Sequence, residues 1–191
     1  GGSWVRAPPG RGRGAGRGRG SLGGGGGPAP PAPRGGAAGR TRQSGAAPYR
    51  LTRKGVLVLL VTSRRTGRWL FPKGGLMAGR EPWESAAQEA FEEAGVQGLA
   101  DPEPLGAYQS RRVRNGRAEQ IEVVIYPLEV TRQLDRWPER GQRRRRWMSL
   151  EEARRRLSDP DLVRMTEVLE QRLQDRRPAR PPPVPRTGSK G

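Results

Sequence analysis

The chain contains no cysteine and no histidine among its 191 residues. Without cysteine, neither a disulfide framework nor a thiolate metal site is available. Without histidine, the sequence excludes histidine-based catalytic triads, histidine-ligated zinc and histidine as a general acid or base. Proton transfer therefore falls to Asp, Glu, Lys, Arg or Tyr.

Long hydrophobic runs are also missing, since the longest run of apolar residues spans only residues 56–61. A membrane-spanning helix needs about 20 apolar residues. No apolar stretch follows the first arginines, as it would in a signal peptide. We therefore expect a cytoplasmic protein that makes no membrane contact.

Acidic and hydrophobic residues are few. The chain has 19 acidic against 37 basic residues, a net charge of +18, a hydrophobic content of 32%, 29 Gly and 19 Pro. That composition is too polar and too rich in helix and strand breakers for a core along the whole length. Residues 1–47 hold eight Arg and no acidic residue, and residues 176–191 hold four Arg, one Lys and no acidic residue. We predict disordered tails over 1–47 and 178–191 around one domain over 48–177.

The first tail contains Arg-Gly repeats over residues 10–14 and 16–20. Such repeats can bind RNA weakly through charge and guanidinium stacking. Compositional drift in an arginine-rich proteome is the explanation that we favour, because Trp4 is the only aromatic residue before Tyr49. A weak RNA contact is therefore one expectation for this segment, and an inert tail is the other.

The middle of the chain alternates apolar runs with turns. Strands are predicted over 56–61, 68–71, 105–111, 118–131 and 143–148, because apolar and β-branched residues gather there between turn residues. Helices are predicted over 82–94, from 150 to about 157, and after Pro160. Gly95 suits the left-handed position that ends the first helix. Strands that enclose one helix and precede two more indicate an α+β fold.

Three glutamates lie on one face of the first helix. Glu89, Glu92 and Glu93 are related as i, i+3 and i+4, and no basic residue lies three or four positions away to offset their repulsion. Carboxylates without thiols or imidazoles favour hard cations, Mg²⁺ or else Mn²⁺. A solvated acidic helix face would show the same spacing, so the wider pattern has to decide.

That wider pattern resembles the Nudix box, which runs Gly, five residues, Glu, seven residues, Arg-Glu, an apolar residue, any residue, Glu-Glu, any residue, Gly and an apolar residue. Counting from Gly74, the spacing is complete. Arg80 stands where the box has its first Glu, and Gln88 stands where it has Arg. A register from Gly75 would recover Glu81 but leaves the second half one residue short, so we prefer the first.

Around the box, residues 69–74, 137–139 and 146–147 resemble the diphosphoinositol polyphosphate phosphohydrolase-like branch, including its bacterial members. The resemblance implies a Nudix-type mixed β-sheet sandwiched by helices. It also implies that Glu89 and Glu93 bind the metal and that Glu92 is the general base, itself close enough to count among the metal ligands. A main-chain carbonyl near Lys73 is expected to complete the metal shell.

Substrate phosphates need cations and N–H donors around them. The resemblance places Ser63 and Arg64 in a loop that contacts phosphate. Basic side chains and the glycine loop supply the other expected contacts. For the run 143–146 a binding and a structural role both stay open, because alternate residues of a strand point to opposite faces and at most half of them could face a cleft. The expected substrate-binding residues are Ser63, Arg64, Lys73, Gly74, Gly75, Arg50 and Arg112.

These observations predict a Mg²⁺-dependent hydrolase that cleaves a phosphoanhydride bond in a nucleoside or inositol polyphosphate. Dinucleoside polyphosphates and diphosphoinositol phosphates are the expected substrates. Two alternatives stay open. The chain could be a catalytically weak Nudix-like binding module that its basic tails recruit to RNA, or a pyrophosphohydrolase that acts on RNA 5′ ends.

Overall fold

The computed structural model describes residues 41–114 and 116–176, apart from the side chains of Arg112 and Arg114. The disorder predicted for residues 1–40 and 178–191 lies outside these residues. Within them, eight strands form one mixed sheet accompanied by three helices, in the order β1 Thr41–Thr52, β2 Gly55–Thr62, β3 Trp69–Leu70, β4 Lys73–Gly75, α1 Pro82–Ala94, β5 Val96–Ala100, β6 Gly106–Arg114, β7 Arg117–Gln133, β8 Arg145–Ser149, α2 Leu150–Arg156 and α3 Pro160–Asp175.

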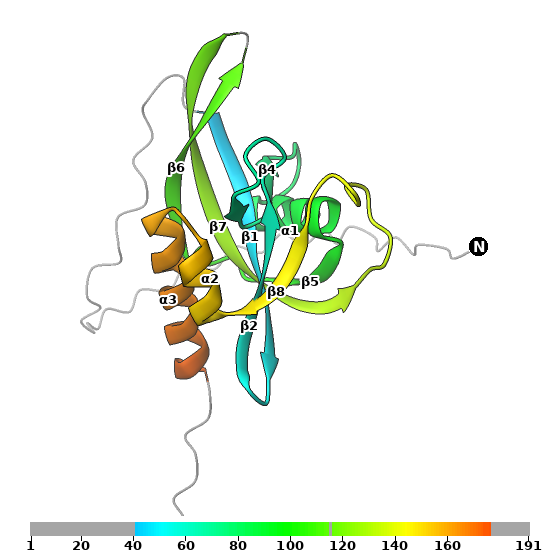
Figure 1. The fold of residues 1–191 in the computed structure, drawn as a ribbon, viewed down its shortest axis with the longest axis vertical. Coiled ribbons are helices and arrows are strands. Elements are labelled where there is room, and N and C mark those ends of the chain that lie inside the picture. Colours follow the sequence, from blue (N-terminus) through cyan, green and yellow to red (C-terminus); the bar gives the residue numbers. More distant parts are fainter. Residues whose placement is uncertain (1–40, 115, 177–191) are drawn as a thin grey trace, which may run out of the picture. The chain divides into compact units, whose positions relative to one another are not determined.

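Strand β1 lies at the centre of the sheet (Figure 1). Its residues Thr41 to Tyr49 pair in parallel with Ile121 to Glu129 of β7, and its last four residues form an antiparallel hairpin with β2. Strand β4 pairs with the first half of β1, β8 pairs with β2, and β5 and β6 both pair with β7. The two long central strands therefore connect the segments that precede and follow α1.

Helices cover both faces of the sheet, with α1 on one and α2 and α3 on the other (Figure 1). On the α1 face, Ala86, Ala90 and Ala94 are fully buried against strand residues such as Leu128. Small side chains let the helix approach the sheet closely. The opposite core contains one face of α3, whose residues are all buried: Leu162, Met165, Leu169 and Leu173. The predicted α+β sandwich is confirmed.

The predicted helix ends are also confirmed. Helix α1 begins with Pro82 and ends before Gly95, whose φ of 63° and ψ of 39° lie in the left-handed region. In α2 the Ser149 hydroxyl accepts a hydrogen bond from the Glu152 N–H, and in α3 the Asp159 carboxylate accepts one from the Asp161 N–H. Each cap satisfies a backbone N–H that has no partner inside its helix.

Residues 41–47, expected in the disordered tail, instead form the first half of β1 and so belong to the folded part of the chain. At Gly45 of this segment there is no room for a side chain. A Cβ on Gly45 would lie 2.7 Å from Ile125 Cδ1 and 2.8 Å from the Pro72 carbonyl oxygen. Small residues buried by close backbone approach form no alternating apolar pattern, so the sequence did not predict this part of the strand.

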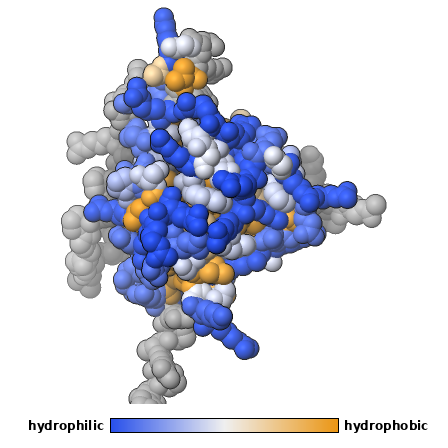
Figure 2. Space-filling view, in the orientation of Figure 1, coloured by the Kyte–Doolittle hydropathy of each residue, from blue (hydrophilic) through white to orange (hydrophobic). Residues whose placement is uncertain are grey.

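The described surface carries no concentrated apolar face in the view of Figure 2, where hydrophilic residues predominate and hydrophobic ones are scattered. The large exposed apolar side chains come from separate elements: Leu51, Leu76, Leu99 and Val113. Among the described helices, none is long and apolar enough to cross a membrane.

Candidate active site

Helix α1 holds the three glutamates of the box at different depths. Glu93 is buried, with 5% of its surface exposed, whereas Glu89 and Glu92 are half-buried. The helix is fixed at its start by two contacts with neighbouring strands and loops. The Ser44 hydroxyl of β1 donates to the Pro82 carbonyl, and the Met77 N–H donates to the Ser85 hydroxyl. The box loop and the helix are thus held as one unit.

Glycine at position 74 allows the box loop to contact the glutamates. A Cβ on Gly74 would lie 2.1 Å from the carboxyl carbon and Oε1 of Glu89. No side chain fits in that gap, so the requirement is for close approach of backbone and carboxylate. One residue earlier, the Lys73 N–H donates to Glu93 Oε2 at 3.2 Å. Strand β4 therefore lies directly beside two of the three glutamates.

A buried arginine, Arg143, provides the counter-charge that was not apparent near the glutamates in sequence. Its guanidinium pairs with Glu93 Oε1, donates to Glu139 Oε2 at 2.6 Å, and donates to the Thr62 carbonyl at 3.1 Å. Its side chain is only 8% exposed. The partner of Glu93 comes from 50 residues away along the chain. Local helix spacing could not identify it, and within the run 143–146 only strand alternation offered a hint.

The glutamates perturb one another. Burial, followed by repulsion from Glu93, Glu92 and Glu139, raises the pKa of Glu89 to about 7. Burial also raises the pKa of Glu93, although Arg143 and the Lys73 N–H favour its ionised form. Among the described residues Glu89 has neither a hydrogen bond nor a salt bridge. A half-buried carboxylate with several acidic neighbours and no salt bridge favours a bound cation.

The donor set fits a hard divalent ion. It offers carboxylate and carbonyl oxygens without sulfur or imidazole ligands, as Mg²⁺ and Mn²⁺ prefer. Glu89 and Glu93 lie one turn apart beside the Gly74 loop. No three acidic side chains converge on a single point in the described part of the chain. Glu93 is turned toward Arg143, so an ion must compete with this arginine for the Glu93 carboxylate.

Besides Gly74, four of the expected substrate residues lie on the segments next to this centre, namely Ser63, Arg64, Lys73 and Gly75. Arg64 lies 3.6 Å from Glu139 Oε1 and donates to Gln142 Oε1 at 3.3 Å. Lys73 Nζ donates to Gln43 Oε1 at 3.0 Å. The Ser63 hydroxyl accepts from the Thr66 N–H within the turn that follows β2. Gly75 is exposed at the end of β4.

The structure does not bring Arg50 to the glutamates. Its guanidinium lies over the Trp147 ring, 4.4 Å from the centroid. Arg50 pairs with Leu57, five residues along β2 from Thr62, which is about 17 Å of strand. Arg112 pairs with Glu119 through the backbones of β6 and β7, and its side chain lies outside the described residues.

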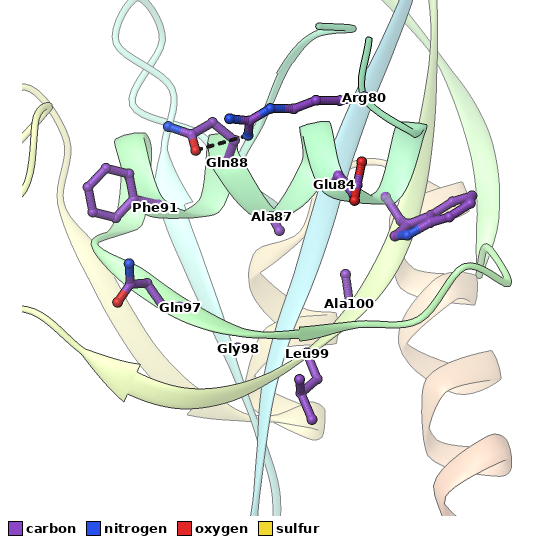
Figure 3. Close-up of a pocket in the computed structure, with 10 residues that line it drawn as sticks. Arg80, Glu84, Ala87, Gln88, Phe91, Gln97, Gly98, Leu99 and Ala100 are labelled. Atoms are coloured by element: carbon purple, nitrogen blue, oxygen red, sulfur yellow. Dashed lines mark hydrogen bonds between the residues drawn. The ribbon is translucent and has the colours of Figure 1, made fainter. Parts of the chain in front are cut away.

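The two residues that depart from the box lie beside each other. Arg80 Nη1 donates to Gln88 Oε1 at 3.3 Å (Figure 3), and both line a groove of about 450 Å³ between α1 and β5. None of Glu89, Glu92 and Glu93 lines this groove. The contact between Arg80 and Gln88, with that of Gly74 and Glu89, favours the register that starts at Gly74.

Comparison with known proteins agrees with this geometry. Residues 41–170 match the model of the NUDIX domain. The chain is 35% identical over 142 residues to Nudix hydrolase 17, mitochondrial, of Arabidopsis thaliana, covering 71% of this chain and 76% of the relative. It is 34% identical over 107 residues to diphosphoinositol polyphosphate phosphohydrolase 3-beta of Bos taurus, a match that covers 55% of this chain and 62% of the relative. For three further Nudix hydrolases of Arabidopsis thaliana, the match spans about three fifths of their length.

The fold is similar to that of the Ap4A hydrolase of C. elegans in its binary complex. The TM-score is 0.54 at 18% identity, and the match covers 71% of this chain and 98% of the other. At this identity the similarity concerns the fold alone. The domain match spans most of the described residues and contains the box with its glutamates. The chain therefore belongs to the Nudix hydrolase family.

Proposed function

We propose that this chain is a Mg²⁺-dependent hydrolase that cleaves a phosphoanhydride bond in a nucleoside or inositol polyphosphate, with Mn²⁺ as an alternative metal. The observation that carries the proposal is the contact of the Gly74 loop with Glu89 beside Glu93. It combines metal-binding oxygens with a glycine-rich loop at one point. Both features suit phosphoanhydride cleavage, because a metal ion and backbone N–H groups can stabilise the charge that develops on phosphate oxygens in the transition state.

Glu89 and Glu93 would hold the metal, with Glu92 close enough to contribute. When bound, the ion would supply positive charge to phosphate oxygens and lower the pKa of a water. Glu92 would take the proton of the attacking water. The water oxygen forms a bond to phosphorus, and the bridging oxygen leaves with the bonding electron pair. Arg64 and Lys73 would donate to phosphate oxygens, Arg64 from its position beside Glu139 and Lys73 from β4.

The substrate class is proposed from chemistry and from relatives. Arg64, Lys73 and Arg143 gather positive charge around the glutamates, which suits a substrate with several phosphates. One relative is named for diphosphoinositol polyphosphate, and one structure of similar fold is named for Ap4A. The expected substrates are therefore diphosphoinositol phosphates and dinucleoside polyphosphates.

A turnover assay that separates all phosphorylated products by anion-exchange chromatography tests the proposal. The full chain is incubated with Mg²⁺ and a panel of dinucleoside polyphosphates, diphosphoinositol phosphates, nucleotide sugars and RNA 5′ ends. We expect Glu92→Gln and Glu93→Gln to lower kcat by at least about 100-fold, since general base and metal ligand are both needed. Glu167→Gln, an exposed glutamate of α3, is the control. Full activity in the Glu92→Gln or Glu93→Gln protein, or no turnover by the parent chain, would contradict the proposal.

The remaining expectations stay predictions. RNA recruitment concerns the Arg-Gly tail, which lies outside the described residues, and removal of residues 1–40 tests it through loss of salt-sensitive RNA binding. Turnover of RNA 5′ ends in the panel would favour the RNA-end alternative. RNA binding without any turnover would favour the weak binding module. The cytoplasmic location awaits localisation of the tagged chain.

A further inference from the structure

The two departures from the Nudix box lie in a continuous chain of hydrogen bonds that ends on Glu92. Arg80 Nη1 donates to Gln88 Oε1 at 3.3 Å, and Gln88 Nε2 donates to Glu92 Oε1 at 2.8 Å. Figure 3 shows Arg80 reaching along the helix from the preceding loop to the Gln88 amide. One replacement residue, Gln88, therefore contacts the glutamate that the proposed function assigns as general base, and the other, Arg80, contacts Gln88.

The chemistry of the three groups fixes the direction of the chain. A guanidinium can only donate, and an ionised carboxylate can only accept. The amide between them must turn its oxygen to Arg80 and its nitrogen to Glu92. The flipped amide would set N–H groups against the guanidinium and an oxygen against the carboxylate. Arg80 thereby determines which end of Gln88 faces Glu92, although it does not contact Glu92 in the described structure.

Gln88 orients the carboxylate without placing a cation on it. An arginine at this position would bring a full charge to the helix face, whereas the amide supplies a neutral donor. Glu92 Oε1 is occupied by the amide, and Oε2 has no hydrogen-bond partner among the described residues. Oε2 is then the oxygen available to a water or a metal. A glutamate side chain loses much rotational freedom on ordering, so fixing it in advance favours the reaction.

We propose that Gln88, held in its orientation by Arg80, is a positioning residue that fixes the carboxylate of Glu92 for proton transfer. The inference rests on the proposed function for the role of Glu92. It assigns a joint purpose to the two positions at which this chain differs from the box. The lost Glu and Arg are replaced by a donor chain that ends on the general base.

Steady-state kinetics test the catalytic part. Gln88→Ala and Arg80→Ala should lower kcat by about 10- to 100-fold with little change in KM, the usual effect of removing a supporting partner. Arg80→Lys retains a donor and should recover most of the activity. Gln97→Ala, a glutamine on β5 that lines the same groove, is the matched control and should match the parent chain.

A double-mutant cycle separates positioning from general structural damage. If Gln88 acts through Glu92, Gln88→Ala should cause no further loss in the Glu92→Gln background. An unchanged kcat in Gln88→Ala, or a full additional loss in that background, overturns the inference. The proposed function is judged separately, by the single Glu92→Gln variant. If that variant loses activity, the proposed function stands whatever the Gln88→Ala result.

The bond chain can also be tested without turnover, by NMR of the Gln88 side-chain amide in the metal-free full chain. Its signals, assigned by their absence in Gln88→Ala, should exchange slowly with water and should move in Arg80→Ala and Glu92→Gln. They should not move in Gln97→Ala. Signals like those of an exposed glutamine overturn the inference even if no substrate is found. Slow exchange without turnover would instead count against the proposed function alone.

Discussion

Because Gly74 has no side chain, the box loop can approach the carboxyl group of Glu89 closely. Gly74→Ala would place a methyl group 2.1 Å from the Glu89 carboxyl, and that carboxylate must turn away. We expect Mn²⁺ or Mg²⁺ affinity to fall by about 10- to 100-fold while the fold persists, because the change displaces one ligand only. Isothermal titration calorimetry measures the affinity.

The neighbouring Gly75 provides the control for this prediction. A Cβ at Gly75 meets nothing within 4 Å, so Gly75→Ala should bind metal like the parent chain. Equal affinities for Gly74→Ala and Gly75→Ala would show that Glu89 does not hold the ion.

Removing Arg143 should leave the carboxylate of Glu93 buried and unpaired. Breaking such a pair costs about 3–5 kcal/mol, and Arg143→Met should lower the free energy of unfolding of the metal-free protein by about that amount. Urea denaturation at pH 8 measures it. Arg146→Met, whose side chain is 54% exposed beside Glu152, should have a much smaller effect. Added Mg²⁺ should recover part of the loss in Arg143→Met, since an ion can take the place of the guanidinium.

At this scale, local spacing was sufficient to predict that Glu89, Glu92 and Glu93 lie together on helix α1, as the structure has them. Their roles as metal ligands and general base stay predictions. Arg143 was not selected, because its contact with Glu93 depends on how the β7–β8 connection folds over α1. Arg50 was expected near the substrate, yet strand pairing places it beside Trp147. Charge type alone does not indicate where a side chain lies.

The acidic face of α1 makes the stability of the metal-free protein depend on pH. Glu89 has a folded pKa of about 7 against an ordinary value of 4.5. Between these values the unfolded chain releases the proton first, so the folded state becomes less stable as the pH rises. Burial of Glu93 acts in the same direction. We expect Tm in EDTA to fall between pH 5 and pH 7.5.

The absence of histidine simplifies this measurement, since no imidazole titrates in the same window. Glu89→Gln should flatten the dependence. Saturating Mg²⁺ should abolish it in the parent chain, because the ion favours the ionised carboxylates. A Tm that rises with pH in EDTA would contradict the prediction.

Among whole elements, α1 was predicted with its observed bounds, because Pro82, Gly95 and an alanine-rich face all agree. Strand β5 was not predicted. It is five residues long, and its register against β7 shifts between Gln97 and Gly98. A Cβ on Gly98 would lie 1.9 Å from the Glu129 carbonyl oxygen, so this edge strand is shaped by contact with its neighbour and not by its own propensity.

For the whole molecule, the position of Thr41 at the start of the central strand determines where the chain can be shortened. Removal of residues 1–40 should leave thermal unfolding of the domain unchanged. Removal of residues 1–47 deletes the part of β1 that pairs with both β4 and β7, and the product should lack a cooperative transition. Circular dichroism of the two truncated chains distinguishes them. A cooperative transition in the shorter chain would show that β1 is dispensable.

The parallel pairing of β1 with β7 also determines when the site can form during synthesis. Thr41 pairs with Ile121, and Arg143 lies further along the chain than both. A ribosome adds about 5–20 residues per second, so β1 waits roughly 4 to 16 seconds for the 80 residues that separate it from its partner. Helix α1 emerges within this interval, before β7 and before the arginine that neutralises Glu93. The glutamates are therefore translated after β1 to β4 but well ahead of β7 and β8, and the site is completed only once the β7–β8 connection has been made.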